Sequence, residues 1–120
     1  MQTVSDIYAY SARLEQSLTE LYAREQDYQT ACEDSAQAEH RYKLKQAREY
    51  LSAEGTEKAR TATALVACDE EYLDYLQKDA VRDFTKLKLQ DSQQALSARQ
   101  SLLTASVKSD LGYSLNKQVV

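Results

Sequence analysis

The chain has 120 residues, a formal net charge of -4, no proline and only two glycines. Its 42% hydrophobic content is too high for a disordered chain, and its negative charge gives no general attraction to nucleic acid. One histidine, and two cysteines without a Cys-x-x-Cys pair, argue against a zinc site or a disulfide framework. Because the chain shows no apolar run of about 20 residues and no secretory signal, we expect a cytoplasmic protein with reduced thiols.

The near-absence of helix breakers is the strongest structural signal in the chain. Between Met1 and Gly112 it leaves a single stop, around Gly55. We therefore predict an all-α fold, a long antiparallel two-helix hairpin that resembles a coiled coil and self-associates. Its single domain would comprise a helix from about 4 to 51, a turn over 52–56, a helix from about 57 to 109 and a short tail over 110–120.

The turn has residues suited to ending one helix and starting the next. Gly55 fits the left-handed position that commonly follows a helix end. Thr56 is a good N-cap, and Glu57 in the first turn complements the helix dipole. The sequence thus predicts a short connection between antiparallel neighbours.

The first helix carries a heptad-like apolar stripe. Ile7, Leu14, Leu21 and Tyr28 recur every seven residues, which is typical of a coiled-coil seam. One hairpin seam cannot bury all of the apolar surface of both helices, so a homo-oligomer is expected. The predicted oligomer interface consists of Ile7, Leu14, Leu18, Leu21 and Tyr28.

The second helix has an apolar pattern of another period. Leu65, Leu76, Leu87 and Ala98 recur every eleven residues, and so do Ala62, Leu73, Phe84 and Ala95. An eleven-residue repeat is close to the natural twist of a straight helix. It predicts nearly straight or slightly right-handed packing rather than a left-handed supercoil.

A cluster of basic residues, here called the basic block, surrounds the predicted turn. Positions 41, 45 and 48 share one helix face, whereas position 43 points elsewhere. Such a row can neutralise phosphates without reading sequence, and the interleaved Tyr42 and Tyr50 could stack on bases. The candidate DNA-binding residues are Arg41, Lys43, Lys45, Arg48, Lys58 and Arg60.

The basic block also has a purely structural interpretation. If the turn lies at 52–56, antiparallel pairing places Arg41 opposite the acidic run Asp69, Glu70 and Glu71. Interhelical salt bridges would then explain the positive charge, since charge runs usually form solvated faces. By the same register Cys32 and Cys68 lie more than two turns apart, which disfavours a disulfide between them.

No pattern in the chain indicates catalysis. The carboxylates Asp69, Glu70, Glu71 and Asp74 lack the Glu-x-x-His pattern of di-metal sites in helical bundles. His40 has no acid-base partner that the sequence identifies, and there is no glycine-rich phosphate loop. We therefore expect a non-enzymatic protein without cofactor or metal.

Residues 39–55, Glu-His-Arg-Tyr-Lys-Leu-Lys-Gln-Ala-Arg-Glu-Tyr-Leu-Ser-Ala-Glu-Gly, resemble the central helix and turn of phage recombination mediators of the UvsY type. In that family a basic helix ends in an aromatic-small-glycine turn. A second helix follows and closes on a pattern like residues 98–103, Ala-Arg-Gln-Ser-Leu-Leu. The resemblance covers about residues 36–108, and its motifs are low in information.

The resemblance implies a ring-like oligomer that binds single-stranded DNA. Such a protein displaces or remodels the single-strand-binding protein and helps to load a RecA-like recombinase. The implied DNA contacts are Lys43, Lys45 and Arg48, with Arg41 as a neighbour. The alternative function is a coiled-coil structural or adaptor protein of phage type that binds only protein partners.

Overall fold

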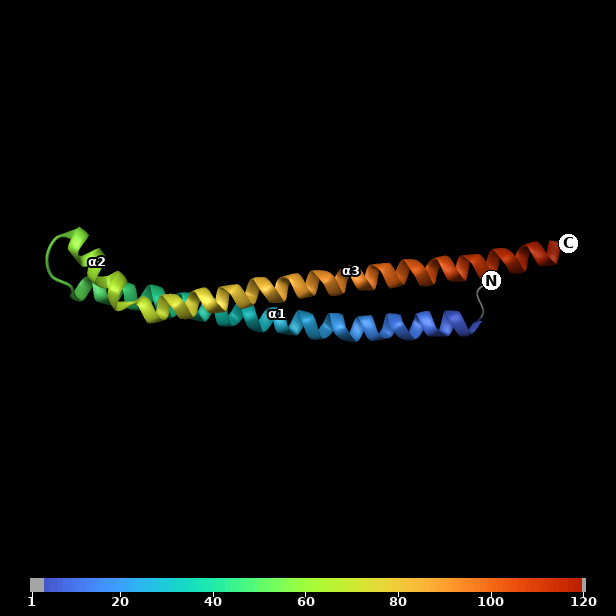
Figure 1. The fold of residues 1–120 in the computed structure, drawn as a ribbon, viewed down its shortest axis with the longest axis horizontal. Coiled ribbons are helices and arrows are strands. Elements are labelled where there is room, and N and C mark those ends of the chain that lie inside the picture. The colour runs from blue at the N-terminus through green and yellow to red at the C-terminus, as the bar shows by residue number, and fades with distance from the viewer. Residues whose placement is uncertain (1–3, 120) are drawn as a thin grey trace. The chain divides into compact units, whose positions relative to one another are not determined.

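The computed structural model describes the backbone of residues 4–119 and the side chains of residues 6–111. It contains three helices, α1 (Val4–Ser52), α2 (Glu57–Ala67) and α3 (Asp69–Val119) (Figure 1). The described residues include no strand, which confirms the predicted all-α class. The predicted start of the first helix, its end near Ser52 and the start of the second helix at Glu57 are also confirmed.

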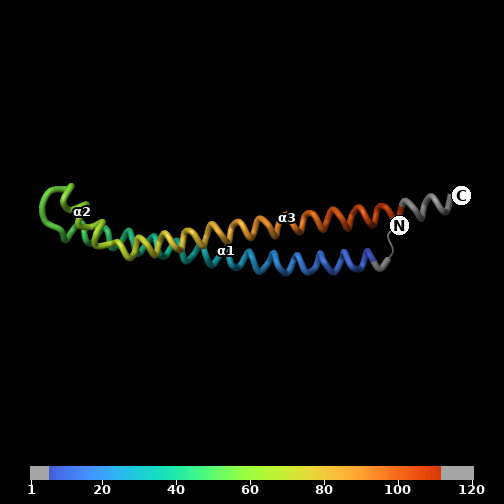
Figure 2. The backbone as a smooth tube through the Cα atoms, in the orientation of Figure 1, coloured from blue at the N-terminus to red at the C-terminus, as the bar shows by residue number. Residues whose placement is uncertain are grey.

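The connection between α1 and α2 has the predicted local structure. Gly55 has a φ of 104°, a conformation that side chains other than glycine rarely adopt. The Thr56 hydroxyl accepts a hydrogen bond from the Ala59 amide at 3.2 Å and so caps α2. Before the turn, the Ala53 amide donates to the Glu49 carbonyl at 3.0 Å, which closes the last turn of α1. The chain therefore reverses direction within four residues (Figure 2).

The second half of the hairpin differs from the prediction in two places, at an internal division and at its C-terminal end. It is divided at Cys68, whose φ of -101° and ψ of 13° end α2, and three acidic residues then occupy the first turn of α3. Acidic side chains stabilise a helix start, which favours a new helix at this position. At the other end the predicted tail after residue 109 is wrong, because α3 continues through Gly112 to Val119. One glycine within a helix costs only about 1 kcal/mol, and no proline follows it.

The predicted single domain is divided into two compact units. Residues 26–86 form the first, here called the turn unit, and residues up to 25 together with those from 87 onward form the second, here called the terminal unit. In the turn unit the Ser35 hydroxyl of α1 donates to Asp79 Oδ1 of α3 at 3.3 Å. In the terminal unit Arg99 of α3 donates to the Arg13 carbonyl of α1 at 3.0 Å and to the Ser17 hydroxyl. Each unit is thus an antiparallel pair of helices.

The core of the described residues consists of small side chains. The buried hydrophobic residues are Ala31, Ala38, Ala64 and Cys68, all in the turn unit, and the buried polar residues are Ser17, Ser35 and Ser106. Small residues let helix axes approach closely. No large apolar side chain of the described part is fully buried. The larger apolar side chains of the described part are therefore half-buried or exposed to solvent.

In the turn unit, α1 and α3 face each other through heptad positions. On α1 the buried and half-buried positions include 28, 31, 35, 38, 42 and 45, and on α3 they include 71, 75, 78, 82 and 85. The heptad predicted over residues 7–28 lies mostly in the terminal unit, and the turn unit shows that the same period continues on α1 beyond Tyr28. On α3, however, the eleven-residue stripe does not form the seam, since Leu73, Leu76 and Phe84 are exposed. The inward positions of both helices are separated by three and four residues in alternation. The inner face of α3 therefore has the heptad period.

Candidate functional site

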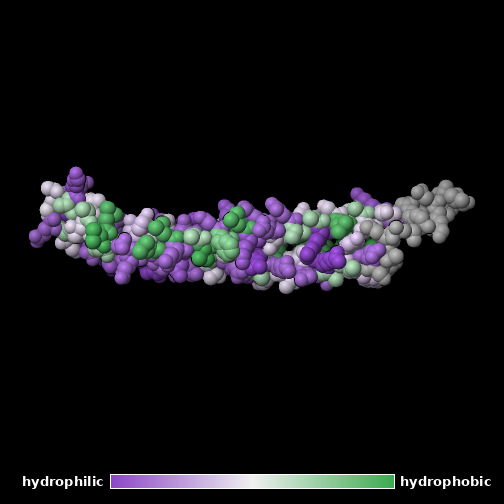
Figure 3. Space-filling model, in the orientation of Figure 1, coloured by the Kyte–Doolittle hydropathy of each residue, from purple (hydrophilic) through white to green (hydrophobic). Residues whose placement is uncertain are grey.

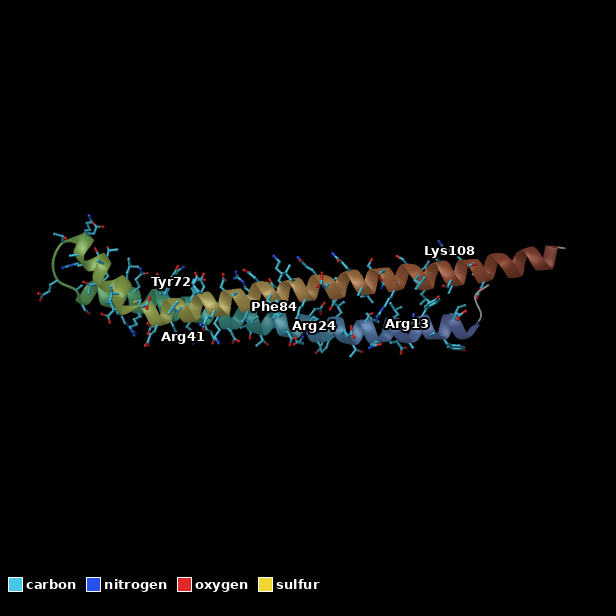
Figure 4. All side chains as sticks on the ribbon, viewed as in Figure 1. Arg13, Arg24, Arg41, Tyr72, Phe84 and Lys108 are labelled. Atoms are coloured by element: carbon cyan, nitrogen blue, oxygen red, sulfur yellow. The ribbon has the colours of Figure 1, made fainter. Side chains whose placement is uncertain are left out.

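Three members of the basic block form ion pairs within the turn unit. Arg41 Nη2 lies 3.3 Å from Asp74 Oδ2, and Lys45 Nζ lies 2.9 Å from Glu71 Oε1. Lys43 Nζ lies 2.6 Å from Glu39 Oε1, one turn earlier on the same helix. The first two pairs join α1 to α3. Figure 4 labels Arg41 on α1 and Tyr72 on α3. Salt bridges to the acidic start of α3 thus exist, as the structural interpretation predicted.

The register of these pairs differs from the prediction. Arg41 meets Asp74 instead of a residue between 69 and 71, which is at least three residues further along α3. The offset is seen beyond Cys68, where α2 ends and α3 begins. Residues before it form a separate helix, α2, so pairing cannot be extrapolated from the turn across that point.

The ion pairs change the proton affinity of their members. The hydrogen bond from Lys45 lowers the pKa of Glu71 below its ordinary value of 4.5, and the same bond raises the pKa of Lys45. A hydrogen bond to Glu39 likewise raises the pKa of Lys43. All three shifts favour the charged forms, so these pairs persist at neutral pH. Their positive charge is compensated locally by carboxylates.

The other three members of the basic block lie closer to the turn. Arg48 and Lys58 are exposed, and Arg60 is half-buried. Within the described part of the chain these three residues form no ion pair. The Nε atom of Arg60 is buried and has no hydrogen-bond acceptor among those residues. The turn end of this unit therefore carries three cations without an ion-pair partner among the described residues.

The two tyrosines of the basic block are packed differently. Tyr42 lies against Tyr72, with ring centroids 5.1 Å apart, and stacks on Tyr75 at 6.2 Å. Such aromatic pairs stabilise the contact between α1 and α3. Tyr50 is half-buried and lines an open groove of ≈ 380 Å³ between α1 and α2. The groove is lined by Lys43, Gln46, Ala47, Tyr50, Leu51, Thr61 and Ala64.

The residues predicted for an oligomer interface occupy two kinds of position. Ile7, Leu14, Leu21 and Tyr28 are half-buried, and in the terminal unit Leu14 and Leu21 share the heptad face of Ser17, which binds Arg99. Leu18 is exposed. Most of this stripe thus serves the seam within the hairpin, and its use between copies remains a prediction.

The described residues contain two free thiols and no cluster of metal-ligating side chains. Both cysteines are free, as the sequence predicted. Burial raises the pKa of the Cys68 thiol, so this thiol is protonated at neutral pH, and a hydrogen bond with Cys32 raises the pKa of Tyr28. No cluster of three His, Cys, Asp or Glu residues that could hold a metal ion occurs among them. None of their helices combines the length and apolar character needed to span a membrane.

The main apolar surface of the turn unit lies on the outside of α3. It consists of Leu73, Leu76, Ala80 and Phe84, all exposed, and is here called the outer stripe. At 100° per residue these positions lie opposite the inward-facing 71, 75, 78 and 82. Figure 3 shows apolar side chains among polar ones on the face that it draws, which includes α2 and part of α3. The eleven-residue repeat revealed this stripe in the sequence, but its outward direction could not be predicted from the period alone.

Comparisons of the chain with protein-family models, curated proteins and solved structures give no match. They therefore leave the resemblance to UvsY-type mediators as an expectation. The function has to be argued from the outer stripe and the basic block.

Proposed function

We propose that this chain is a non-enzymatic helical-hairpin protein that acts by binding proteins, including further copies of itself, through α-helical contacts in the reducing cytoplasm. One observation carries the proposal: the core is made of alanine, serine and cysteine, while leucine and phenylalanine side chains of α3 are exposed. Exposed apolar stripes on a helix are typical of surfaces that another helix covers. The two free thiols are consistent with a reducing compartment.

The basic block supports the same proposal. Its interhelical pairs, Arg41–Asp74 and Lys45–Glu71, give these residues a role in the hairpin that needs no nucleic acid. Tyr42 contacts two tyrosines of α3, so its ring already has partners in this unit. Phosphates would have to compete with the nearby carboxylates for both cations.

A recombination mediator that binds single-stranded DNA, with a RecA-like recombinase and a single-strand-binding protein as partners, is the second candidate. The observation in its favour is the uncompensated charge of Arg48, Lys58 and Arg60 at the turn. Exposed cations can bind phosphates without reading sequence. This candidate predicts binding that weakens steeply with salt.

One triple substitution separates the two candidates. Lys43→Ala, Lys45→Ala and Arg48→Ala remove two ion-paired cations and one that is uncompensated. We expect the wild type to show no salt-dependent binding to a labelled single strand of about 40 nucleotides, and the triple variant to melt at a lower temperature because the Lys45–Glu71 pair is lost. The measurements are fluorescence anisotropy at two salt concentrations and thermal melting by circular dichroism.

The control carries Lys86→Ala, Lys88→Ala and Lys108→Ala, which remove the same charge outside the basic block. Salt-dependent DNA binding by the wild type and the control that is weakened in the triple variant would overturn the proposal in favour of the mediator. In that case the salt slope of the triple variant should be shallower by roughly two units, since each single-strand phosphate contact contributes about 0.7.

A further inference from the structure

The outer stripe has a spacing that is symmetrical about one small residue. Leu76 and Phe84 lie four residues before and after Ala80, and in the sequence Leu73 and Leu87 lie seven residues before and after it. A two-fold axis relates residue i of one copy to residue j of the other and residue j to residue i. Two antiparallel copies of α3 crossing at Ala80 would therefore place leucine against phenylalanine on both sides of the axis.

The side chains around Ala80 favour this close approach. Ala80 has a single methyl group, so two helices can approach closely where it meets its copy. The exposed residues three positions from Ala80 on the outer face are Gln77 and Asp83. A two-fold axis at Ala80 sets Asp83 of one copy beside uncharged Gln77 of the other, whereas its carboxylate would repel a phosphate backbone.

The period of the outer stripe also selects its partner. An eleven-residue repeat keeps its residues on one side of a nearly straight helix, and a partner must have a matching straight apolar face. Within the turn unit, the exposed face of α1 is mainly polar, with residues such as Gln29, Glu33, Gln37 and His40. The outer stripe of a second copy is a straight apolar face of the kind that this partner must have.

We infer that a second copy of this chain covers the outer stripe, in a two-fold antiparallel contact between α3 helices centred on Ala80. The inference rests on the proposed function and adds its partner, surface and polarity. It places the contact between copies on α3, at residues other than the predicted Ile7, Leu14, Leu18, Leu21 and Tyr28.

Disulfide trapping tests the geometry. In a background of Cys32→Ala and Cys68→Ala, Ala80→Cys should form a covalent dimer under mild oxidation, because the two copies of residue 80 meet at the axis. Leu76→Cys alone should not, since an antiparallel pairing separates its two copies by eight residues, or about 12 Å, beyond disulfide reach. A mixture of Leu76→Cys with Phe84→Cys should cross-link. Ala36→Cys, at an exposed alanine on α1, is the matched control and should stay monomeric on a denaturing gel.

Mass measurement tests the surface independently. Leu76→Asp, at a site 43% exposed, should convert the wild-type dimer to monomer in analytical ultracentrifugation without loss of helix content. Leu44→Asp, at a site 40% exposed on α1, should leave the dimer intact. A monomeric wild type at about 10 μM, a dimer that survives Leu76→Asp, or cross-linking of Leu76→Cys alone would each overturn the inference.

The outcomes are distinguishable from failure of the proposed function. An oligomer that survives Leu76→Asp would overturn this surface and leave the protein-binding function standing. Salt-dependent DNA binding that is lost in the triple variant of the basic block would overturn the function, whatever the oligomeric state.

Discussion

At the scale of single residues, small side chains determine how closely the helices of the turn unit approach. Ala31, Ser35 and Ala38 occupy successive inward positions of α1 and are almost fully buried. Atoms in such contacts are close-packed, so added volume must displace a helix. Charged residues act at the margin of the same contact, where Lys45 and Glu71 pair. Packing of small residues thus contributes more to this seam than its ion pairs, which are partly exposed.

Ala38→Leu tests the packing of this seam. Ala38 is 1% exposed, so a leucine would overpack the contact, and we expect a loss of about 1–3 kcal/mol in the free energy of unfolding. Ala36→Leu, two residues away on the exposed face of α1, is the matched control and should change stability by less than about 0.5 kcal/mol. Urea denaturation followed by circular dichroism measures both. Equal effects of the two substitutions would contradict the orientation of α1.

At the scale of elements, caps and turn residues decide where the helices begin and end. Gly55 permits the reversal, Thr56 caps α2, and the acidic first turn of α3 supports a new start after Cys68. Gly112, in contrast, does not end α3. A glycine ends a helix when the chain takes a left-handed conformation there, as it does at Gly55. The positive φ at Gly55, rather than the residue type alone, marks the boundary.

Thr56→Ala tests the cap of α2. The substitution removes the hydroxyl that accepts from the Ala59 amide, and we expect a loss of about 1 kcal/mol in the free energy of unfolding. Thr63→Ala is the control because Thr63 is exposed within the same helix and donates only to the Ala59 carbonyl. It should be neutral or slightly stabilising, since alanine has the higher helix propensity. Chemical denaturation of both variants checks the difference, and a neutral Thr56→Ala would argue against the cap.

At the scale of the whole molecule, buried apolar residues are unevenly distributed between the two units. All four buried hydrophobic residues of the described part belong to the turn unit. In the terminal unit the buried side chains are Ser17 and Ser106, and Arg99 donates to Ser17. Polar contacts of this kind add little net stability per bond. The terminal unit should therefore open more readily than the turn unit.

Hydrogen exchange followed by mass spectrometry tests this difference. Amides of residues 28–45 should exchange at least about tenfold more slowly than those of residues 10–22, because opening of the turn unit exposes its apolar core. Both segments belong to α1, so the comparison is made within one helix. Equal protection of the two segments would show that the units open together and would contradict the prediction.

The sequence by itself determined the all-α class, the two helix boundaries at the turn, its glycine and its threonine cap. These features depend on local residue preferences, and proline and glycine are nearly absent elsewhere. The heptad of α1 was also visible, since its apolar residues recur at fixed spacing. The salt-bridge interpretation of the basic block holds between the helices for Arg41 and Lys45, although Asp74, the partner of Arg41, lies further along α3 than expected.

Only the tertiary structure decided which face of α3 turns inward. Its apolar residues have the eleven-residue period, which suggested a seam, yet the inward positions are occupied by residues such as Glu71, Tyr75 and Arg82. An apolar repeat identifies which residues share a helix face, but it does not show which partner covers that face. The register of α3 against α1 decides which cations meet carboxylates. Long-range pairing, unlike helix boundaries, depends on residues far apart in the chain.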